Sequence, residues 1–574
     1  MSPSEGFCGS MPRFAFGFVF GVAVLFAVMT CGTPIARAAD VFDDRAIVTE
    51  SGPLEGIVTA QINEYLGIPY AAPPVGALRW MPPRPFGRWQ GVLNATQFGK
   101  ECPQLSVTVP QQSVGDENCL FLNVYRPNVG ESPDKDDGHA NDKWNHDGHH
   151  GLAVMVWIHG GGLTQGAGSD FDPTPLVEGG GVIVVTINYR LGLLGFLAHP
   201  ALDHEGHLAG NYGLMDQQFA LGWVRRNIAA FGGNPHRVTV FGESAGGLSV
   251  YSQLASPLAA GLFQKAIAQS GAYASFADYL DQIIPIKDAE TTGSPGVEPG
   301  TAVADAVGCG GLSLRQTAAC LRGPTVTAAA LVNLRPRAIY PFIDGILLTQ
   351  PPGAAFASGK FNRIPVITGT NHDEYRYFVA RDWVDPTLGL LPNGNYAATV
   401  EMVFGTSVAA NVLSQPEYQL PTSPPPPPEA ASLLLGAAGT DGIFACTARH
   451  AMQSLAHYVT IYAYEFNDEN APVPTFPYAI NFQLGAYHSA DVQYLFNRGG
   501  IPAPFNKDQK QLSQTMIGYW TQFAKTGDPN SPGQPLWAPY DPVSDERLSL
   551  LPPEPVVESG FATDHECTTF WDLL

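Results

Sequence analysis

Basic residues are scarce in this sequence. Its 574 residues include 30 Lys and Arg against 52 Asp and Glu, so the formal net charge at pH 7 is −22. A surface with so few cations repels the phosphates of nucleic acids and the head groups of anionic membranes. We therefore expect neither as a partner, and the acidic balance mainly favours solubility.

Two further features are missing. No Cys-x-x-Cys spacing occurs, which argues against a zinc or redox site. Only one apolar run is long enough to approach a membrane span, at 14–29, and Arg13 precedes it. Because Ala-Arg-Ala follows at 36–38, we interpret residues 1–38 as a secretory signal. An uncleaved anchor and lipid attachment at Cys31 are the alternatives.

Cleavage of this signal predicts a secreted or periplasmic protein without stable membrane insertion. Six cysteines follow residue 38, and six cysteines can pair in 15 ways. An even number in an exported chain favours disulfides. Two pairs are close in sequence, which leaves the third pair by elimination. The expected disulfides are Cys102–Cys119, Cys309–Cys320 and Cys446–Cys567.

Two segments stand apart by composition. Residues 127–151 are rich in Asp, Asn, Gly and His, which fits a metal-collecting loop or, as the favoured interpretation, a solvated insertion between strands. Five consecutive prolines at 424–428 favour a rigid surface connector over a ligand for proline-binding domains. Asn94 begins a glycosylation sequon, which matters only in a host that glycosylates.

Continuous apolar runs predict buried parallel strands. Such runs occur at 152–158, 181–190, 238–241, 266–271, 364–369 and 459–466. A helix is predicted over 216–230, where Leu221, Val224 and Ile228 recur at helical spacing. Residues 285–301 have the composition of a loop. The alternation of strands and helices predicts an α/β fold, with a mostly parallel central sheet flanked by helices.

One stretch places a strand, a sharp turn and a helix around Ser244. The apolar residues 238–241 lead into Gly-x-Ser-x-Gly at 242–246, and a helix-compatible run follows at 248–254. Such a turn accepts only small neighbours and exposes the serine at the head of a helix, where free N–H groups favour negative charge. Gly-x-Ser-x-Gly alone is common in ordinary turns, but this context indicates a nucleophile.

Three consecutive glycines follow the apolar run at 152–158 and His159. In Gly160, Gly161 and Gly162 the backbone N–H groups are unshielded and can form an oxyanion hole, although a flexible turn is the alternative. Both glycine motifs lie at the carboxyl ends of predicted parallel strands. That edge of the sheet is where α/β proteins place their active groups.

An activated serine needs a histidine as general base and a carboxylate that orients the histidine. Downstream of Ser244, Asp373 and Glu374 follow a predicted strand, and His488 lies in a turn-like segment. The weaker candidates lie in a helical pattern or near the end of the chain: His450, His457 and His565.

These motifs together resemble the type-B carboxylesterases of the cholinesterase family. The matching segments extend over nearly the whole chain after residue 38 and include 67–71, 73–74, 78–80, 117–123, 159–162, 210–217, 231–235, 241–247, 269–271, 371–374, 485–488 and 520–527. Jointly they are highly specific. The resemblance implies the α/β-hydrolase fold, with helical and loop insertions that cover a catalytic gorge.

The resemblance also implies a catalytic triad. Ser244 would be the nucleophile, His488 the base and Glu374, rather than Asp373, the orienting acid. His488 would take the serine proton, the serine would attack an ester carbonyl, and water would hydrolyse the acyl-enzyme after the alcohol leaves. This chemistry implies a small-molecule ester as the partner and requires neither a metal nor an organic cofactor.

Further residues receive roles by the same resemblance. The N–H groups of Gly161, Gly162 and Ala245 would form the oxyanion hole. Glu243 matches a family position beside the triad, where its charge would favour a cationic His488. The alternative for Glu243 is simple packing against the edge of the sheet.

Departures from the family narrow the substrate. Cholinesterases carry a choline-binding Trp between the first two disulfide cysteines, whereas residues 103–118 contain no aromatic residue. A cation–π site for a quaternary ammonium is therefore missing, which argues against choline esters. Where cholinesterases place acyl-pocket aromatics, this chain has Arg335 and Arg337. We hypothesise that one of them binds a carboxylate on the substrate, with a surface salt bridge as the alternative.

Residues 39–574 are interpreted as a single catalytic domain with cap-like insertions at roughly 275–360 and 375–480. The predicted function is that of an exported serine carboxylesterase, with esters of carboxylate-bearing acids as a hypothetical substrate class. One alternative is a non-catalytic adhesion or binding member of the family, but such relatives typically lose the serine or histidine. The other is a lipase, which needs an apolar lid that residues 75–118 do not supply.

Overall fold

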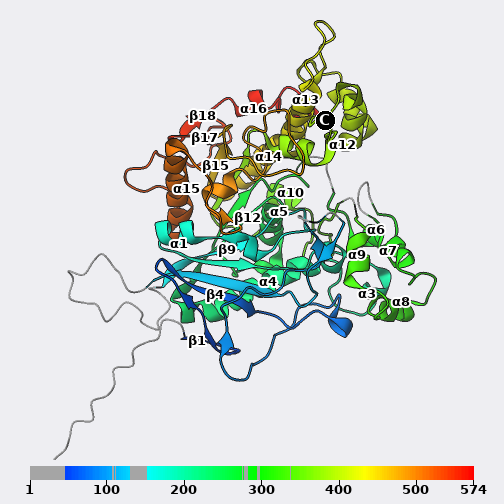
Figure 1. The fold of residues 1–574 in the computed structure, drawn as a ribbon, viewed down its shortest axis with the longest axis vertical. Coiled ribbons are helices and arrows are strands. Elements are labelled where there is room, and N and C mark those ends of the chain that lie inside the picture. Colours follow the sequence, from blue (N-terminus) through cyan, green and yellow to red (C-terminus); the bar gives the residue numbers. More distant parts are fainter. Residues whose placement is uncertain are drawn as a thin grey trace, which may run out of the picture. The chain divides into compact units, whose positions relative to one another are not determined.

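A mixed sheet of 11 strands lies at the centre of the computed structural model (Figure 1). The structure describes residues 46–106, 109, 111–128, 151–274, 276, 282–293, 298–336 and 338–574. All of these belong to one unit, Asp44–Leu574. The predicted signal at 1–38 and residues 129–150 of the His-rich segment lie outside the described residues.

The middle of this sheet is parallel and its edges are antiparallel. Along the sheet the strands are β18 (Val556–Glu558), β17 (Arg547–Leu550), β15 (Ile461–Phe466), β14 (Val366–Asn371), β13 (Lys265–Gln269), β12 (Gly233–Glu243), β9 (Leu152–Ile158), β11 (Ile183–Ile187), β8 (Phe121–Pro127), β4 (Ile62–Pro69) and β3 (Ile57–Val58). Neighbours from β17 to β11 run parallel, whereas β8, β4, β3 and β18 pair in the antiparallel sense. The predicted α/β fold is confirmed.

The strand β9 shows why both faces of the sheet must be covered. Its side chains alternate between two apolar cores, with Val154 and Val156 in one and Met155 and Trp157 in the other. An apolar strand of this kind is stable only between two layers of helices. The first core is covered by α4 (Tyr212–Asn227), α5 (Ala245–Ala255), α10 (Pro352–Ala357) and α14 (Cys446–Ala456), and the second by α1 (Thr174–Gly180) and α15 (Lys507–Thr526).

Residues 285–301 are not the loop that the sequence predicts. They contain α6 (Ile286–Thr291) and the start of α7 (Gly300–Ala306). Ile286 and Ala289, three residues apart, are both buried. A helix this short is held by tertiary packing rather than by its own sequence pattern, so the prediction was wrong. Two further helices follow in this region: α8 (Leu314–Leu321) and α9 (Ala328–Asn333).

A second group of helices lies between β14 and β15. It comprises α11 (Glu374–Phe378), α12 (Tyr396–Val412), α13 (Ala430–Gly439) and α14. Contrary to the expectation from the sequence, the run at 14–29 is not the only one of sufficient length. Within the described part of the chain, the helical stretch Ala430–Ala456 is also long and apolar enough to cross a membrane, and 78% of its apolar window is buried in the protein. Because β15 is a strand of the central sheet, the range 375–480 is not an insertion throughout.

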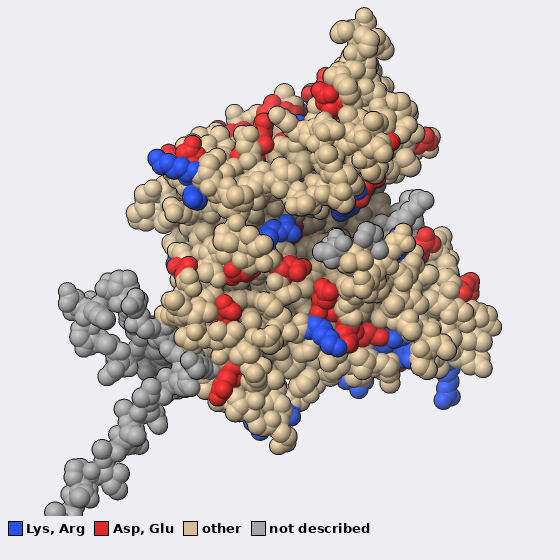
Figure 2. Space-filling view, in the orientation of Figure 1, with Lys and Arg blue, Asp and Glu red and all other residues tan. Residues whose placement is uncertain are grey.

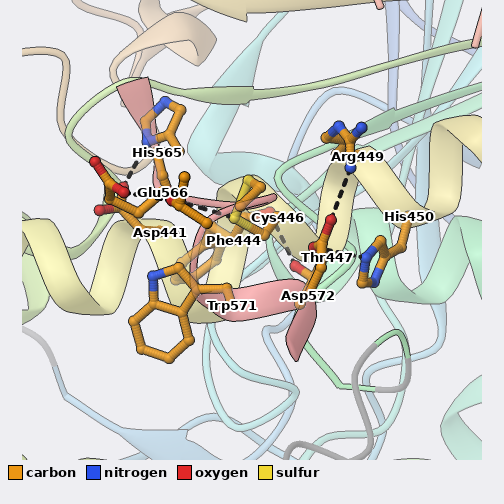
Figure 3. The surroundings of a disulfide bond; sticks show 12 residues. Asp441, Phe444, Cys446, Thr447, Arg449, His450, His565, Glu566, Trp571 and Asp572 are labelled. Carbon is orange, nitrogen blue, oxygen red and sulfur yellow. Dashed lines mark hydrogen bonds and ion pairs between the residues drawn. A yellow bond between two sulfur atoms is a disulfide. The ribbon is translucent and has the colours of Figure 1, made fainter. Parts of the chain in front are cut away.

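All three expected disulfides are present. Cys102 bonds to Cys119 and Cys309 to Cys320, across 17 and 11 residues. The third joins Cys446, at the start of α14, to Cys567 across 121 residues (Figure 3).

Charged side chains are dispersed over the face seen in Figure 2, and they form no continuous basic surface on that face.

Candidate active site

Ser244 occupies a strained turn between β12 and α5. Its φ of 57° and ψ of −122° form a backbone conformation that is unfavourable for a residue with a side chain. The neighbouring glycines allow it, because a Cβ on Gly242 or Gly246 would lie 2.6 or 1.9 Å from the carbonyl oxygen of Ile158 in β9. The close approach of β9 thus explains why both positions are glycine.

His488 and Glu374 meet at the carboxyl edge of the same sheet. Glu374 follows β14 and begins α11, and His488 lies in the loop after β15. Nδ1 of His488 is 2.5 Å from Oε2 of Glu374, and both residues are buried. The other oxygen, Oε1, accepts hydrogen bonds from the Thr370 hydroxyl and the Asn371 N–H, each at 2.8 Å. Every strong contact of this carboxylate therefore fixes it against the imidazole.

Asp373, the neighbouring carboxylate, points elsewhere. Its Oδ1 lies 2.8 Å from Nη2 of Arg376, and its Oδ2 accepts a hydrogen bond of 2.9 Å from the Ala486 N–H. The structure thus brings Glu374, and not Asp373, to His488.

A second carboxylate lies on the other side of the His488 ring. Oε1 of Glu243 is 3.2 Å from Nε2 of His488. Burial lowers the pKa of His488, but the charges of Glu243 and Glu374 outweigh it, so that the pKa is raised above its usual value. Among the described side chains, no hydrogen bond joins Ser244 to His488; such catalytic contacts often close only when substrate binds.

The glycines after β9 form a turn whose amides are available. Gly161 and Gly162 have φ of 99° and 63°, and a Cβ on Gly161 would lie 2.2 Å from the Gln165 carbonyl oxygen. Within the described residues, neither glycine amide has a hydrogen-bond partner. Ala245 is the first residue of α5, so its N–H group likewise has no hydrogen-bond partner within the helix.

His159, the residue before this turn, is held in place by Tyr189. It is buried and stacks on Tyr189, with ring centroids 4.5 Å apart. The Tyr189 hydroxyl donates a 2.7 Å hydrogen bond to the His159 carbonyl oxygen. These contacts hold the start of the glycine turn rigidly against the sheet.

Several aromatic residues around the site were not predicted from the sequence. Phe378 and Phe444 lie with ring centroids 4.8 and 5.1 Å from that of His488. Phe378 lies one turn of α11 beyond Glu374, so the spacing from the predicted acid was a usable signal. Burial is the main cause that raises the pKa of Tyr273, and a hydrogen bond with the Ser244 side chain lowers it in part. An apolar wall therefore borders the histidine.

Of the two arginines hypothesised to bind substrate, the structure describes Arg335 alone. Arg335 is exposed, and its side chain has no ion-pair or hydrogen-bond partner among the described residues. Within the described residues, Arg335 therefore does not form the surface salt bridge that was the alternative to substrate binding. Arg337 lies outside the described residues.

One cluster in the described part of the chain has the residue types of a metal site: His372, Glu465 and His565, with ligand atoms within 4.8 Å of one another. Both ring nitrogens of His565 are already engaged, Nδ1 with Asp441 at 2.5 Å (Figure 3) and Nε2 with Glu465 at 2.7 Å. Despite burial, these carboxylates raise the pKa of His565 to about 10. The cluster is thus accounted for as an imidazolium held between two carboxylates.

A serine at a strained turn after a parallel strand, with a histidine and an acid following it in the chain, defines an α/β-hydrolase. Residues 43–569 match the model of the carboxylesterase family. The chain therefore belongs to the carboxylesterase family.

Similar proteins include esterases from bacteria and animals. Para-nitrobenzyl esterase of Bacillus subtilis (strain 168) is 34% identical over 527 residues, which cover 88% of this chain and 94% of that protein. Pyrethroid hydrolase Ces2e of Rattus norvegicus is 32% identical over 526 residues, covering 89% and 85%. A solved PNB esterase structure is 31% identical, with a TM-score of 0.70 and coverage of 91% and 99%. The chain is accordingly a carboxylic ester hydrolase. This finding argues against the alternative of a non-catalytic adhesion or binding protein.

Proposed function

We propose that this protein is an exported serine carboxylesterase whose triad is Ser244, His488 and Glu374. The observation that carries the proposal is the buried hydrogen bond between Nδ1 of His488 and Glu374, beside the strained turn of Ser244. With Nδ1 held in this way, Nε2 is the nitrogen that accepts the serine proton.

In the proposed reaction, Oγ of Ser244 bonds to the ester carbonyl carbon while its proton passes to Nε2 of His488. The carbonyl oxygen becomes an oxyanion, which the amides of Gly161, Gly162 and Ala245 stabilise. The ester C–O bond then breaks, and the imidazolium gives its proton to the departing alcohol. Water repeats these steps on the acyl-enzyme and releases the acid. Loss of one oxyanion donor typically lowers the rate by about 10²–10³-fold.

Export is supported by the three disulfides, because such bonds persist in oxidising compartments. A protein processed as proposed has a mature N-terminus just after Ala38. Sequencing of that terminus tests the proposal, and retention of residues 1–38 would contradict it.

Esters of carboxylate-bearing acids stay a hypothesis for the substrate class. The exposed guanidinium of Arg335 is free to bind an anion, but nothing in the described structure places it beside Ser244. Rates on acidic and neutral esters of one alcohol should be compared for the wild type and Arg335→Ala and Arg337→Ala variants. Equal effects on both ester classes would remove the hypothesis.

The triad is tested by hydrolysis of p-nitrophenyl esters from acetate to palmitate. We expect short-chain activity in the wild type and none above background in Ser244→Ala. Ser252→Ala, a buried serine two turns further along α5, serves as the matched control. Preference for palmitate would favour the lipase alternative, and equal activity of Ser244→Ala and wild type would exclude the triad.

A further inference from the structure

Ser489, the residue after His488, has a backbone conformation that favours glycine. Its φ is 69°, in the left-handed region that residues with side chains rarely adopt. Glycine would adopt this conformation without strain. The presence of serine therefore calls for a reason in the side chain.

The Ser489 side chain contacts the carboxylate beside the proposed base. Its hydroxyl donates a 2.6 Å hydrogen bond to Oε1 of Glu243, the same oxygen that lies 3.2 Å from Nε2 of His488. Among the described side chains, Ser489 and His488 alone make a hydrogen bond or ion pair with this carboxylate. Glu243 itself is only 4% exposed, so water does not replace a missing donor easily.

The charge of Glu243 depends on several groups that face it. Burial raises its pKa most, His488 and the Ser489 hydrogen bond lower the pKa, and the charges of Asp491 and Glu374 raise it, so that the pKa of Glu243 is raised to about 7. The phenols of Tyr273 and Tyr464 also lie within electrostatic reach of Glu243. Asp491 has donors of its own, the Gln269 amide at 2.7 Å and the Tyr464 hydroxyl at 3.3 Å. Among the described side chains, Ser489 is thus the one neutral hydrogen-bond donor to Glu243.

We propose that Ser489 is a positioning residue of the esterase: its hydroxyl keeps Glu243 ionised and directed at Nε2 of His488. The proposal rests on the triad proposed above. When Nε2 accepts the serine proton, the imidazolium lies between two carboxylates, Glu374 at Nδ1 and Glu243 at Nε2. A protonated Glu243 would instead donate its own proton to Nε2 and occupy the atom that must act as the base.

The test is the pH profile of kcat/KM on p-nitrophenyl acetate for the wild type, Ser489→Ala and Ser489→Gly. Loss of the hydroxyl raises the pKa of the coupled Glu243–His488 pair, because the carboxylate form loses a donor. We expect the acidic limb to move up by about one pH unit in both variants, since a hydrogen bond to a charged group is worth roughly that much. The alkaline plateau is retained, because neutral His488 and ionised Glu243 are both present there.

Two comparisons separate this role from a purely structural one. Ser489→Gly also removes the backbone strain, so it folds even where Ser489→Ala does not. In a Glu243→Gln background the two Ser489 variants should leave the acidic limb unmoved, because the group through which Ser489 acts is gone. A normalised profile identical to wild type in both variants, or an equal shift in the Glu243→Gln background, overturns the proposal. Failure of the triad itself is recognised separately, by activity of Ser244→Ala, and removes this proposal too.

Discussion

At the scale of single residues, the two ring nitrogens of His488 face different carboxylates. Glu374 contacts Nδ1 and is itself held by Thr370 and Asn371, whereas Glu243 lies at Nε2. The first contact fixes the tautomer, and the second favours the charge that forms when Nε2 takes a proton. The ring therefore has both the orientation and the electrostatic support that a general base needs.

The adjacent carboxylates Glu374 and Asp373 make a matched test of the acid. We expect Glu374→Gln to lower kcat by about 10³–10⁴-fold, because the imidazole loses the acceptor that fixes its tautomer. Asp373→Asn should retain most of the activity, since its contacts go to Arg376 and Ala486. Steady-state kinetics on p-nitrophenyl acetate decides, and a larger loss in Asp373→Asn would contradict the assignment.

Single residues were predicted from the sequence where chemistry and a local motif coincide. Ser244 follows a strand at a recognisable turn, so its placement needed no knowledge of packing. The same pattern offered both Asp373 and Glu374, and the choice of Glu374 came from the family resemblance. The contact of Ser489 with Glu243 joins residues that are 246 apart in sequence, and no local sequence pattern predicts it. The position of Arg335 was equally beyond the sequence, because it depends on how the loop after α9 packs.

At the scale of elements, the turn between β12 and α5 depends on the neighbouring strand β9. The carbonyl of Ile158, the last residue of β9, lies against Gly242 and Gly246. The amides of the oxyanion turn follow the same strand. One strand therefore shapes both the nucleophile turn and the proposed oxyanion hole.

Gly246→Ala should disrupt this packing severely. The new Cβ would lie 1.9 Å from the Ile158 carbonyl oxygen, a backbone atom that cannot move without breaking the sheet. We expect a destabilisation above about 4 kcal/mol or insoluble protein. Gly394→Ala, where no atom lies within 4 Å, is the control and should unfold at the wild-type denaturant concentration. Equal stability of the two variants would show that the turn is less constrained than described.

The elements themselves were largely predictable where an apolar run is continuous. The strand β9 is buried along nearly its whole length and β12 is buried continuously over 238–243, so both can be recognised from their apolar runs alone. The short helix α6 was missed because its buried residues, Ile286, Ala289 and Glu290, are stabilised by contacts with distant segments. Local sequence thus indicates the sheet, whereas tertiary contacts decide the helices that cover it.

At the scale of the whole molecule, the C-terminal segment is tied to the rest of the fold in two ways. One is the disulfide between Cys446 and Cys567 (Figure 3), and the other is the buried ring of His565, which lies between Asp441 and Glu465. Arg449 and His450, both on α14, also contact Asp572 near the end of the chain. The last residues therefore form part of the core structure.

The His565 ion cluster predicts a dependence of stability on pH. Its pKa is raised from about 6.5 in the unfolded chain to about 10 in the folded protein, so its stabilisation is complete below pH 6.5 and is lost as the pH rises toward 10. We expect His565→Gln to cost about 3–5 kcal/mol at pH 6, because two buried carboxylates lose their cation. The difference from wild type should shrink by pH 9.

Urea unfolding at the two pH values, with disulfides intact, measures this effect. His457→Gln is the control, since His457 is exposed at the end of α14. A His565→Gln penalty that does not change with pH would mean that the ring is neutral in the folded protein.

The central claim is that Ser244 is the nucleophile, and covalent labelling tests it most directly. The wild type and Ser244→Ala should be treated with a fluorophosphonate and examined by intact-mass and peptide mass spectrometry. The account predicts one adduct per wild-type chain, on the peptide that contains Ser244, and none on the variant. An adduct on another residue, or a wild type that is not labelled yet hydrolyses esters, would contradict it.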